Sequence, residues 1–293
     1  MDILEYENTQ EIKSHGHKDF PFNIYLCSIP LDFSIVPLHW HNDMEIIYIK
    51  KGKGRVTVDL DPFFVSQGDI VIVPPGQLHA IEQMEGCSME YENIIFNLSM
   101  LMPAQGDSCT ETFFQPMLQG QILFPSHFTI ESSLYPSLSL CLNTMDEICK
   151  TFGKGYQLAI KGQLFSFFYT LASSCPSPTP RQKHKSLDRL KDILKYVETN
   201  YSEKIPIKDA ARICGFSESH FMKFFKSNME LSFTDYLNDY RLTMAARMLL
   251  SSSGSIATIA VETGFGNLSY FNRSFKRKYG CTPTAFRAGG PDF

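Results

Sequence analysis

The stretch GFGNLSYFNRSFKRKYGCTP, residues 264 to 283, decides how the C-terminal part of this chain folds. Ahead of it, Ser255 can cap a short amphipathic helix, which Gly264 can end because glycine tolerates a positive φ. A second helix follows and stops at Thr282-Pro283. The pattern therefore predicts a helix, a tight turn and a second helix.

The second helix of this pair has an apolar side and a polar side. Leu268, Phe271 and Phe275 recur at helical spacing and are expected to face inward. The residues left on the outer side are Asn267, Ser269, Asn272, Arg273 and Lys276. Such a face can hydrogen-bond to base edges and phosphates, because a DNA major groove admits one α-helix. An ordinary helical hairpin with a solvated basic face would show the same local pattern.

The same pattern occurs about fifty residues earlier, as an internal repeat. Gly215-Phe216 corresponds to Gly264-Phe265, and Phe225-Lys226 corresponds to Phe275-Lys276. The outward candidates in this first unit are Ser219, His220, Lys223 and Lys226. Between the two units, residues 235–250 are predicted to form one long helix that fixes the spacing of the two polar faces.

The net charge of −4 over 293 residues hides a division along the chain. Residues 1–180 contain 9 Lys+Arg and 20 Asp+Glu, a balance of −11, whereas residues 181–293 contain 18 and 11, a balance of +7. An acidic first part joined to a basic last part indicates that only the last part meets a polyanion such as DNA.

The first part is rich in short segments of β-forming residues. Strands are predicted at 22–28, 44–50, 55–60, 70–73 and 91–97, separated by turn signals such as Gly52-Lys53-Gly54. Many short strands without intervening helices favour an antiparallel barrel or sandwich. We assign this barrel to residues 1–105.

Four residues with metal-binding or hydrogen-bonding side chains lie among these strands: His39, His41, Glu45 and His79. Residues at alternate positions of a strand share a face, so His39, His41 and Glu45 can converge. Imidazole and carboxylate groups suit Fe, Mn, Ni or Zn. They could equally line a pocket for a small molecule, and histidines packed in a core are a third interpretation, disfavoured because each buried polar group would need a partner.

The chain from 106 to 185 connects the two parts. Residues 106–173 contain an irregular apolar bridge and two helices at 134–148 and 158–171, joined near Gly153-Lys154-Gly155. The second of these helices is apolar over more than one face, which suits a partner subunit as well as an internal core. Three alternating prolines then predict an extended linker at 174–185, ahead of a helical domain at 186–293.

Several classes of protein are disfavoured. No apolar run reaches the length of a membrane span, and the acidic start lacks the features of a signal peptide, so a cytoplasmic protein without membrane contact is expected. The eight scattered cysteines form no C-x-x-C pair. No catalytic nucleophile or acid pair is evident, so we expect no enzyme activity and no obligatory cofactor.

The repeated unit resembles the DNA-binding domain of the AraC/XylS family of transcription regulators. The resemblance runs from Leu187 to Arg287. It is carried by Gly264, Phe265, Ser269, Tyr270, Phe271, Phe275, Lys276, Gly280, Thr282 and Pro283, with Arg241 and Ala245 in the joining helix. One departure is Glu230, which stands where the second unit has Gly280, and it predicts a strained or altered turn in the first unit.

The barrel resembles the cupins, which that family commonly carries ahead of its DNA-binding domain. His39 to Gly52 follows the first cupin motif and Gly68 to His79 the second, with Gln83 where that motif usually has Asn. In metal-dependent cupins these histidine and glutamate positions bind a metal, whereas in a large non-enzymatic branch they line a small-molecule pocket. A divalent metal at His39, His41, Glu45 and His79 is therefore an open alternative.

Together the two resemblances imply a multidomain protein, with an N-terminal cupin barrel and helical hairpin and a C-terminal all-α domain of two helix-turn-helix units. The implied function is a sequence-specific transcription regulator, an activator, controlled by a sugar or metabolite in the barrel. The implied partners are promoter DNA, RNA polymerase and a second copy of the chain. Lys226, Lys276, Arg277 and Lys278 are expected to meet phosphates rather than bases.

Two rival functions stay open at this point. In a cupin metalloenzyme, the four-residue cluster would hold a catalytic ion and the basic domain would be accessory. In a constitutive regulator, the barrel would serve only for dimerisation.

Overall fold

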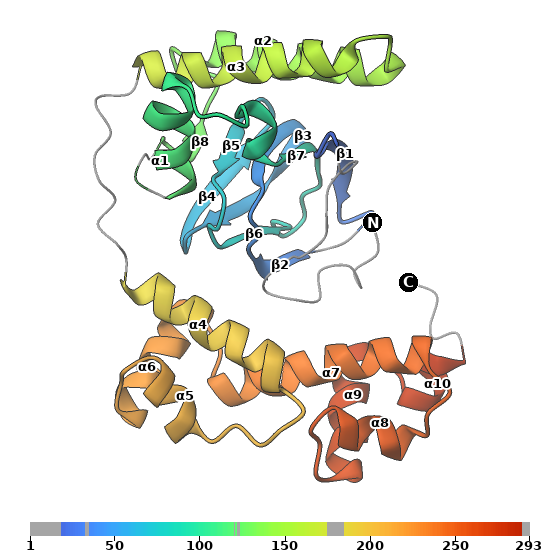
Figure 1. Cartoon of the computed structure of the whole chain (residues 1–293). Helices are drawn as coiled ribbons and strands as arrows, with labels where there is room; N and C mark the ends of the chain where they lie inside the picture. Colours follow the sequence, from blue (N-terminus) through green and yellow to red (C-terminus); the bar gives the residue numbers. More distant parts are fainter. Residues whose placement is uncertain (1–18, 33–34, 120, 122–123, 175–184, 289–293) are drawn as a thin grey trace. The chain divides into compact units, whose positions relative to one another are not determined.

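The computed structural model describes residues 19–32, 35–119, 121, 124–174 and 185–288. These residues form two compact units, each of which is described by itself (Figure 1). Most of the linker predicted at 174–185 lies outside the described residues. The predicted fold class, a β-rich N-terminal domain followed by a helical domain, is confirmed.

The first unit is built on an antiparallel sheet of eight strands. The strands are β1 (Phe22–Ile29), β2 (Ile35–His39), β3 (Met44–Val58), β4 (Asp61–Ser66), β5 (Ile70–Val73), β6 (His79–Glu82), β7 (Met89–Phe96) and β8 (His127–Phe128). The main order is β1-β7-β3-β5-β8, while β4 pairs with β3, and β6 pairs with both β2 and β3.

Strand β3 connects the two parts of this sheet. Its first half pairs with β5 and β7, and its second half pairs with β4 and β6. The sequence predicted two strands separated by a turn at Gly52, and that prediction is wrong, because one strand of 15 residues runs through it. A Cβ at Gly52 would lie 2.0 Å from the Ser88 carbonyl oxygen. This glycine therefore permits close approach of the backbone just before β7, and it does not form a turn.

The two faces of the sheet carry two separate cores, as the period-two alternation of strands requires. Ile47, Val71 and Tyr91 belong to the cluster enclosed by the strands. Ile46 and Phe96 belong to the cluster that faces the helices. The first cluster therefore fills the barrel, and the second attaches the barrel to its helical cover.

The helical cover consists of the 3₁₀ segment η2 (Leu98–Leu101), the π-helical segment η3 (Thr110–Phe114), α1 (Gln115–Leu118), α2 (Tyr135–Thr151) and α3 (Tyr156–Ser174). Helices α2 and α3 lie side by side over the sheet (Figure 1). Leu138 and Leu142 of α2 and Leu164 and Phe168 of α3 are buried in the same core as the sheet residue Phe96. This burial accounts for most of the apolar spacing seen in the two helices.

The second unit is entirely helical in its described part. Its helices are α4 (Lys185–Asn200), α5 (Ile207–Ile213), α6 (Glu218–Met229), α7 (Phe233–Ser251), α8 (Ile256–Glu262), α9 (Leu268–Tyr279) and α10 (Pro283–Arg287). Helix α7 has 19 residues and stands between the pairs α5–α6 and α8–α9. The C-terminal half of α7 forms one core with α8 and α9, through Leu242, Leu249, Ile259 and Phe271.

Candidate functional site

The first helix-turn-helix is formed by α5 and α6. Gly215 makes the turn at φ 66°, and the Ser217 hydroxyl caps α6 by accepting a hydrogen bond from the His220 backbone N–H at 3.3 Å. Phe221 and Phe225 are buried, as predicted from their spacing. The side chains that this helix leaves exposed include the candidates Ser219, His220, Lys223 and Lys226.

The His220 ring is not wholly available for reading bases. Its centroid lies 4.1 Å from that of Phe216, so the imidazole packs on an aromatic ring of the turn. The Arg189 guanidinium covers the same Phe216 ring at 4.6 Å. His220 therefore also helps to shape the start of the recognition helix α6.

The second helix-turn-helix, α8 and α9, presents the larger polar face. Phe271 and Phe275 are fully buried, whereas Leu268, which the sequence placed inward, is 43% exposed because it begins the helix. The candidates Asn267, Ser269, Asn272, Arg273 and Lys276 are all exposed. The structure thus brings these five residues together on the outer side and at the start of α9.

Asn267 has a structural role that its exposure does not suggest. Its side-chain oxygen accepts a hydrogen bond from the Tyr270 backbone N–H at 2.8 Å and so caps α9. The amide nitrogen is the part of this side chain that is left to donate to a base or phosphate. Asn272 and Arg273 lie further along α9, and their side chains do not cap the helix.

The two recognition helices end in the same backbone conformation. Gly280 follows α9 at φ 73°, and Glu230 follows α6 at φ 59°. The left-handed region disfavours residues that have a Cβ, so the first unit keeps the geometry of the second at an energetic cost. The unusual turn expected at Glu230 is therefore present as strain rather than as an altered path.

Lys278 differs from the other basic residues of α9. Its ammonium lies 2.7 Å from Asp239 Oδ2, and it donates to the Asp239 carbonyl and the Thr243 hydroxyl at 3.1 and 2.8 Å. Burial lowers the pKa of Lys278, and the Asp239 carboxylate opposes that shift. Lys278 therefore joins α9 to α7, and the phosphate contact predicted for it would compete with these bonds.

Arg241 is a positioning residue whose contacts the sequence did not reveal. From α7 it donates to the Tyr201 carbonyl through Nε and to the Glu203 carbonyl through Nη2, both at 2.7 Å. Gly264, in the turn of the second unit, lies directly beside this guanidinium. Arg241 therefore fixes the end of α4 and the second turn relative to α7.

In the barrel, His39, His41, Glu45 and His79 form a single buried cluster, and none exposes more than 3% of its surface. One carboxylate oxygen of Glu45 lies 2.8 Å from His41 Nε2 and 2.9 Å from His79 Nε2. The His39 ring centroid lies 4.0 Å from that of His79. The convergence predicted from the sequence is thus present in the structure.

The backbone fixes the orientation of the three imidazoles. Their Nδ1 atoms lie 2.9, 3.0 and 3.0 Å from the carbonyl oxygens of Pro37, Asp43 and Gln77, for His39, His41 and His79 respectively. Because a carbonyl oxygen only accepts hydrogen bonds, each Nδ1 carries a proton. The Nε2 atoms of His41 and His79 then face a carboxylate, so each of these contacts requires a further proton or a cation.

Burial and the neighbouring charges act on the ionisation of this cluster. Burial, with the nearby His79, holds the pKa of His39 well below its usual range. For Glu45, burial acts to raise the pKa, but the charges and hydrogen bonds of His79 and His41 outweigh it and hold that pKa well below its usual range. Glu45 is therefore an anion that the surrounding imidazoles stabilise.

The cluster fits a divalent transition metal. Each of the four side chains offers one ligand atom, and these atoms all lie within 4.8 Å of one another. Three imidazoles and one carboxylate are borderline and hard donors of the kind that Fe, Mn, Ni and Zn accept. The Nδ1–H···O=C hydrogen bonds are the outer contacts that orient metal-binding histidines in general.

Comparison with known proteins identifies both units. Residues 31–167 match the model of the AraC-like ligand-binding domain, and residues 199–289 match a helix-turn-helix domain model. The chain belongs to the AraC family of transcriptional regulators. It is accordingly a DNA-binding transcription regulator with a ligand-binding domain, which confirms the predicted family and the predicted class of function.

Relatives of this AraC-family chain extend over most of its length. The uncharacterized HTH-type regulator YdeC of Bacillus subtilis is 22% identical over 284 residues, covering 96% of both chains. The activator RhaR of Mannheimia succiniciproducens is 22% identical, covering 86% of this chain and 87% of its own. A solved AraC-type DNA-binding domain from Chromobacterium violaceum is 26% identical over 35% of this chain and 92% of its own, with a TM-score of 0.34.

Among the described residues, no helix is both long enough and apolar enough to cross a lipid bilayer.

Proposed function

We propose that this AraC-family regulator acts in the cytoplasm as a homodimeric activator, whose binding to promoter DNA is controlled by a small molecule. The observation that carries the proposal is the pairing of two capped recognition helices, α6 and α9, with a buried polar cluster in a separate unit. One unit can read DNA while the other senses a ligand. RNA polymerase is the further partner that an activator requires.

The length of α7, which joins the two helix-turn-helix units, supports binding of α6 and α9 to successive major grooves. Helix α7 has 19 residues, which corresponds to roughly 28 Å at 1.5 Å per residue. Successive major-groove contacts on one face of DNA are roughly 34 Å apart. The exposed faces of α6 and α9 can therefore each occupy one groove.

The roles proposed for the side chains follow from chemistry and exposure. Asn272 and Arg273 suit bidentate hydrogen bonds to adenine and guanine edges, respectively. The other base-reading candidates are Ser219, His220, Lys223, Asn267 and Ser269. Lys226 and Lys276 lie in the last turns of α6 and α9, where we assign them to phosphates.

The barrel cluster is the proposed sensor site. Asn93, on the same side of β7 as the enclosed Tyr91, has a buried Oδ1 with no hydrogen-bond partner in the described part of the chain. A buried acceptor of this kind is usually satisfied by water or a ligand. A sugar or other small polar metabolite inside the barrel could supply that hydrogen bond.

A divalent metal is a second candidate for the sensor site, and the imidazole geometry favours it. His39, His41, Glu45 and His79 would hold the ion. A bound ion would supply positive charge to the Glu45 carboxylate and an attachment point for an oxygen-containing effector. The same geometry would serve a metalloenzyme, but the DNA-binding unit and the named regulators among the relatives favour regulation.

The exposed face of α3 supports the proposed homodimer. Leu158, Gly162, Phe165 and Tyr169 follow steps of four, three and four residues, and Leu158 and Tyr169 are 78% and 74% exposed. Open space surrounds Gly162, so a second helix could approach closely there. In light-scattering measurements, Phe165→Glu should convert a dimer to a monomer, whereas Leu140→Glu, on the exposed side of α2, should not.

Selection of binding sites from random DNA, followed by footprinting, tests the proposed DNA recognition. The expected result is a protected site with two half-sites about one helical turn apart for each protomer. A reporter placed under the selected site then decides the sign of regulation, because an activator raises transcription and a repressor lowers it. Protection without any sequence preference would contradict the proposal.

A further inference from the structure

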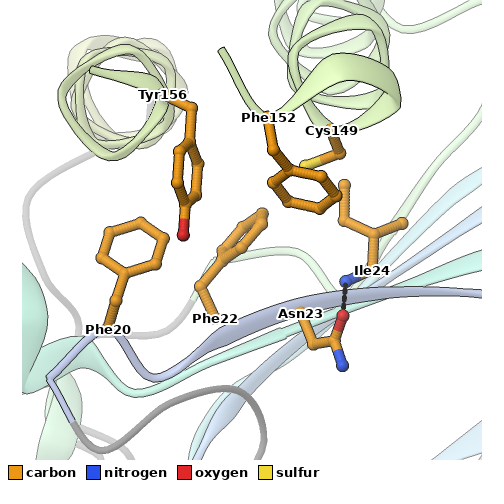
Figure 2. Close-up of a pocket in the computed structure, with 7 residues that line it drawn as sticks. All are labelled: Phe20, Phe22, Asn23, Ile24, Cys149, Phe152 and Tyr156. Atoms are coloured by element: carbon orange, nitrogen blue, oxygen red, sulfur yellow. Dashed lines mark hydrogen bonds between the residues drawn. The ribbon is translucent and has the colours of Figure 1, made fainter. Parts of the chain in front are cut away.

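A cavity of about 320 Å³ lies outside the barrel, between β1, the end of α2 and the start of α3. Figure 2 shows its walls, which come from two segments more than 120 residues apart in the sequence. The side chains that form it are Phe20, Phe22, Ile24, Cys149, Phe152 and Tyr156. Its volume lies within the range of small-molecule sites in proteins.

Aromatic rings form most of the cavity wall. The Tyr156 ring stands edge-on to Phe20 at 5.7 Å and to Phe152 at 5.2 Å, with interplanar angles of 83° and 88°. Phe22 and Ile24 form the floor on β1, and Phe152 and Cys149 lie opposite (Figure 2). Rings at these angles present both faces and edges, which suits a flat aromatic guest.

Few polar groups reach the cavity. The Asn23 side chain turns back and accepts a hydrogen bond from the Ile24 backbone N–H at 2.9 Å. The Tyr156 hydroxyl points between Phe20 and Phe22, and it has no hydrogen-bond partner among the described residues (Figure 2). Within the described part of the chain, no charged side chain lines the cavity. A guest would therefore be apolar or neutral, with about one hydrogen-bonding group.

The backbone at Phe152, which ends α2, holds its side chain at the cavity. Phe152 adopts φ 45° and ψ 43°, in the left-handed region, although Gly153 follows it directly. A bulky residue is rare in that region, and such strain gathers at binding sites and switches. This conformation keeps the Phe152 ring 58% exposed while it faces the cavity, a position in which a bound guest would cover it.

We propose that this cavity is an effector site for a neutral, flat aromatic molecule of roughly ten non-hydrogen atoms. Its guest would contact Tyr156, the first residue of α3, and α3 ends at Ser174, where the chain leaves for the DNA-binding unit. Occupancy would then bias the position of α3 relative to the sheet. The effector role rests on the proposed function, whereas the binding site itself does not.

Indole is a suitable probe, because it is flat and neutral and carries one N–H donor for the Tyr156 hydroxyl. In titrations of the full-length protein, indole should bind saturably with one site per chain. Ile24→Trp, which fills the cavity, should weaken binding at least tenfold. Leu26→Trp is the matched control, since Leu26 is two residues further along β1, is 72% exposed and does not line the cavity. Equal binding to both variants, or no saturable binding to the wild type, would overturn the site.

Cys149 allows the site to be located without any substitution. Burial raises the pKa of its thiol to about 11, and it lines the cavity, whereas Cys87 is half-exposed elsewhere. Indole should slow the modification of Cys149 by N-ethylmaleimide, measured by peptide mass spectrometry, and leave Cys87 unchanged. Equal rates at Cys149 with and without indole would place any bound indole elsewhere.

The effector role has its own readout. With a duplex selected from random DNA, saturating indole should change the Kd of the wild type at least threefold and leave that of Ile24→Trp unchanged. An unchanged Kd despite indole binding overturns the effector role. If the protein selects no duplex, the proposed DNA recognition is refuted. The indole titration still tests the cavity in that case.

Discussion

Arg241 and Gly264 share one small space in the DNA-binding unit. The Arg241 guanidinium crosses the turn to reach the Tyr201 carbonyl, and a Cβ placed on Gly264 would lie 2.7 Å from Arg241 Nε and 2.6 Å from the Tyr201 oxygen. Gly264 also has φ 84°. The glycine that ends α8 is thus required both by its backbone conformation and by the residue beside it.

Gly264→Ala should therefore destabilise the DNA-binding unit by about 2–4 kcal/mol, since it combines a left-handed alanine with a steric clash. The matched control is Gly215→Ala, at φ 66° in the first turn, where nothing lies within 4 Å of the added Cβ. That variant should lose only about 1–2 kcal/mol. Urea unfolding followed by helical circular dichroism measures both, and equal losses would mean that the Arg241 contact has no influence.

At Glu230 the reverse substitution, from a residue with a Cβ to glycine, is expected to stabilise the unit. Its φ of 59° strains a residue with a Cβ, whereas Gly280 occupies the equivalent position after α9 without that strain. Glu230→Gly should stabilise the unit by about 0.5–1 kcal/mol, and Gly280→Ala should destabilise it by about 1–2 kcal/mol. Chemical denaturation of the two variants checks the signs. A loss of stability in Glu230→Gly would show that its side chain makes a contact worth more than the strain.

Arg273 and Lys276 should differ in what they contribute to DNA binding. Arg273→Ala should weaken binding to the selected site by about 1–3 kcal/mol and relax the base preference at one position. Lys276→Ala should weaken binding to selected and to random DNA to a similar extent, and the affinity of this variant should depend less on salt than that of the wild type. Fluorescence anisotropy at several salt concentrations measures both effects.

Arg212→Ala is the control for these two variants. Arg212 lies on α5, is 80% exposed and pairs with Asp209 at 2.9 Å. It lies outside the exposed faces of α6 and α9, so its removal should leave both affinities nearly unchanged. An Arg273→Ala variant with equal losses on selected and random DNA would assign Arg273 to the phosphates.

Much of the DNA-binding unit could be predicted from the sequence, because its signals are local. The Ser217 and Asn267 caps act over three residues, and Gly215 and Gly264 set their turns by their own φ angles. What could not be predicted depends on distant residues. The Arg241 contact joins positions 40 residues apart, and nothing in the local pattern indicates it.

The sequence predicted which residues of the barrel share a strand face, but it did not predict how the strands pair with one another. The strand parity of His39, His41 and Glu45 indicated that they converge, whereas the pairing of His39 with His79 depends on the alignment of β2 with β6. The apparent turn at Gly52 misled because a glycine can serve a turn or a close backbone approach, and the neighbour Ser88 is 36 residues away. The cavity at Phe152 was missed because its two walls come from opposite ends of the unit.

The histidine cluster makes a final prediction, which concerns metal binding. If a divalent ion satisfies the Nε2 and carboxylate atoms, Ni²⁺ or Zn²⁺ at a hundredfold excess over its Kd should raise the melting temperature of the sensor unit by roughly 5–10 °C. Glu45→Gln should reduce the shift, because it removes the anionic ligand and leaves three imidazoles. His127→Gln is the control, since His127 pairs with Asp69 at 3.0 Å outside the cluster and should keep the full shift. If neither ion changes the melting temperature of the metal-free protein, the cluster does not bind metal and is a pocket for an organic effector alone.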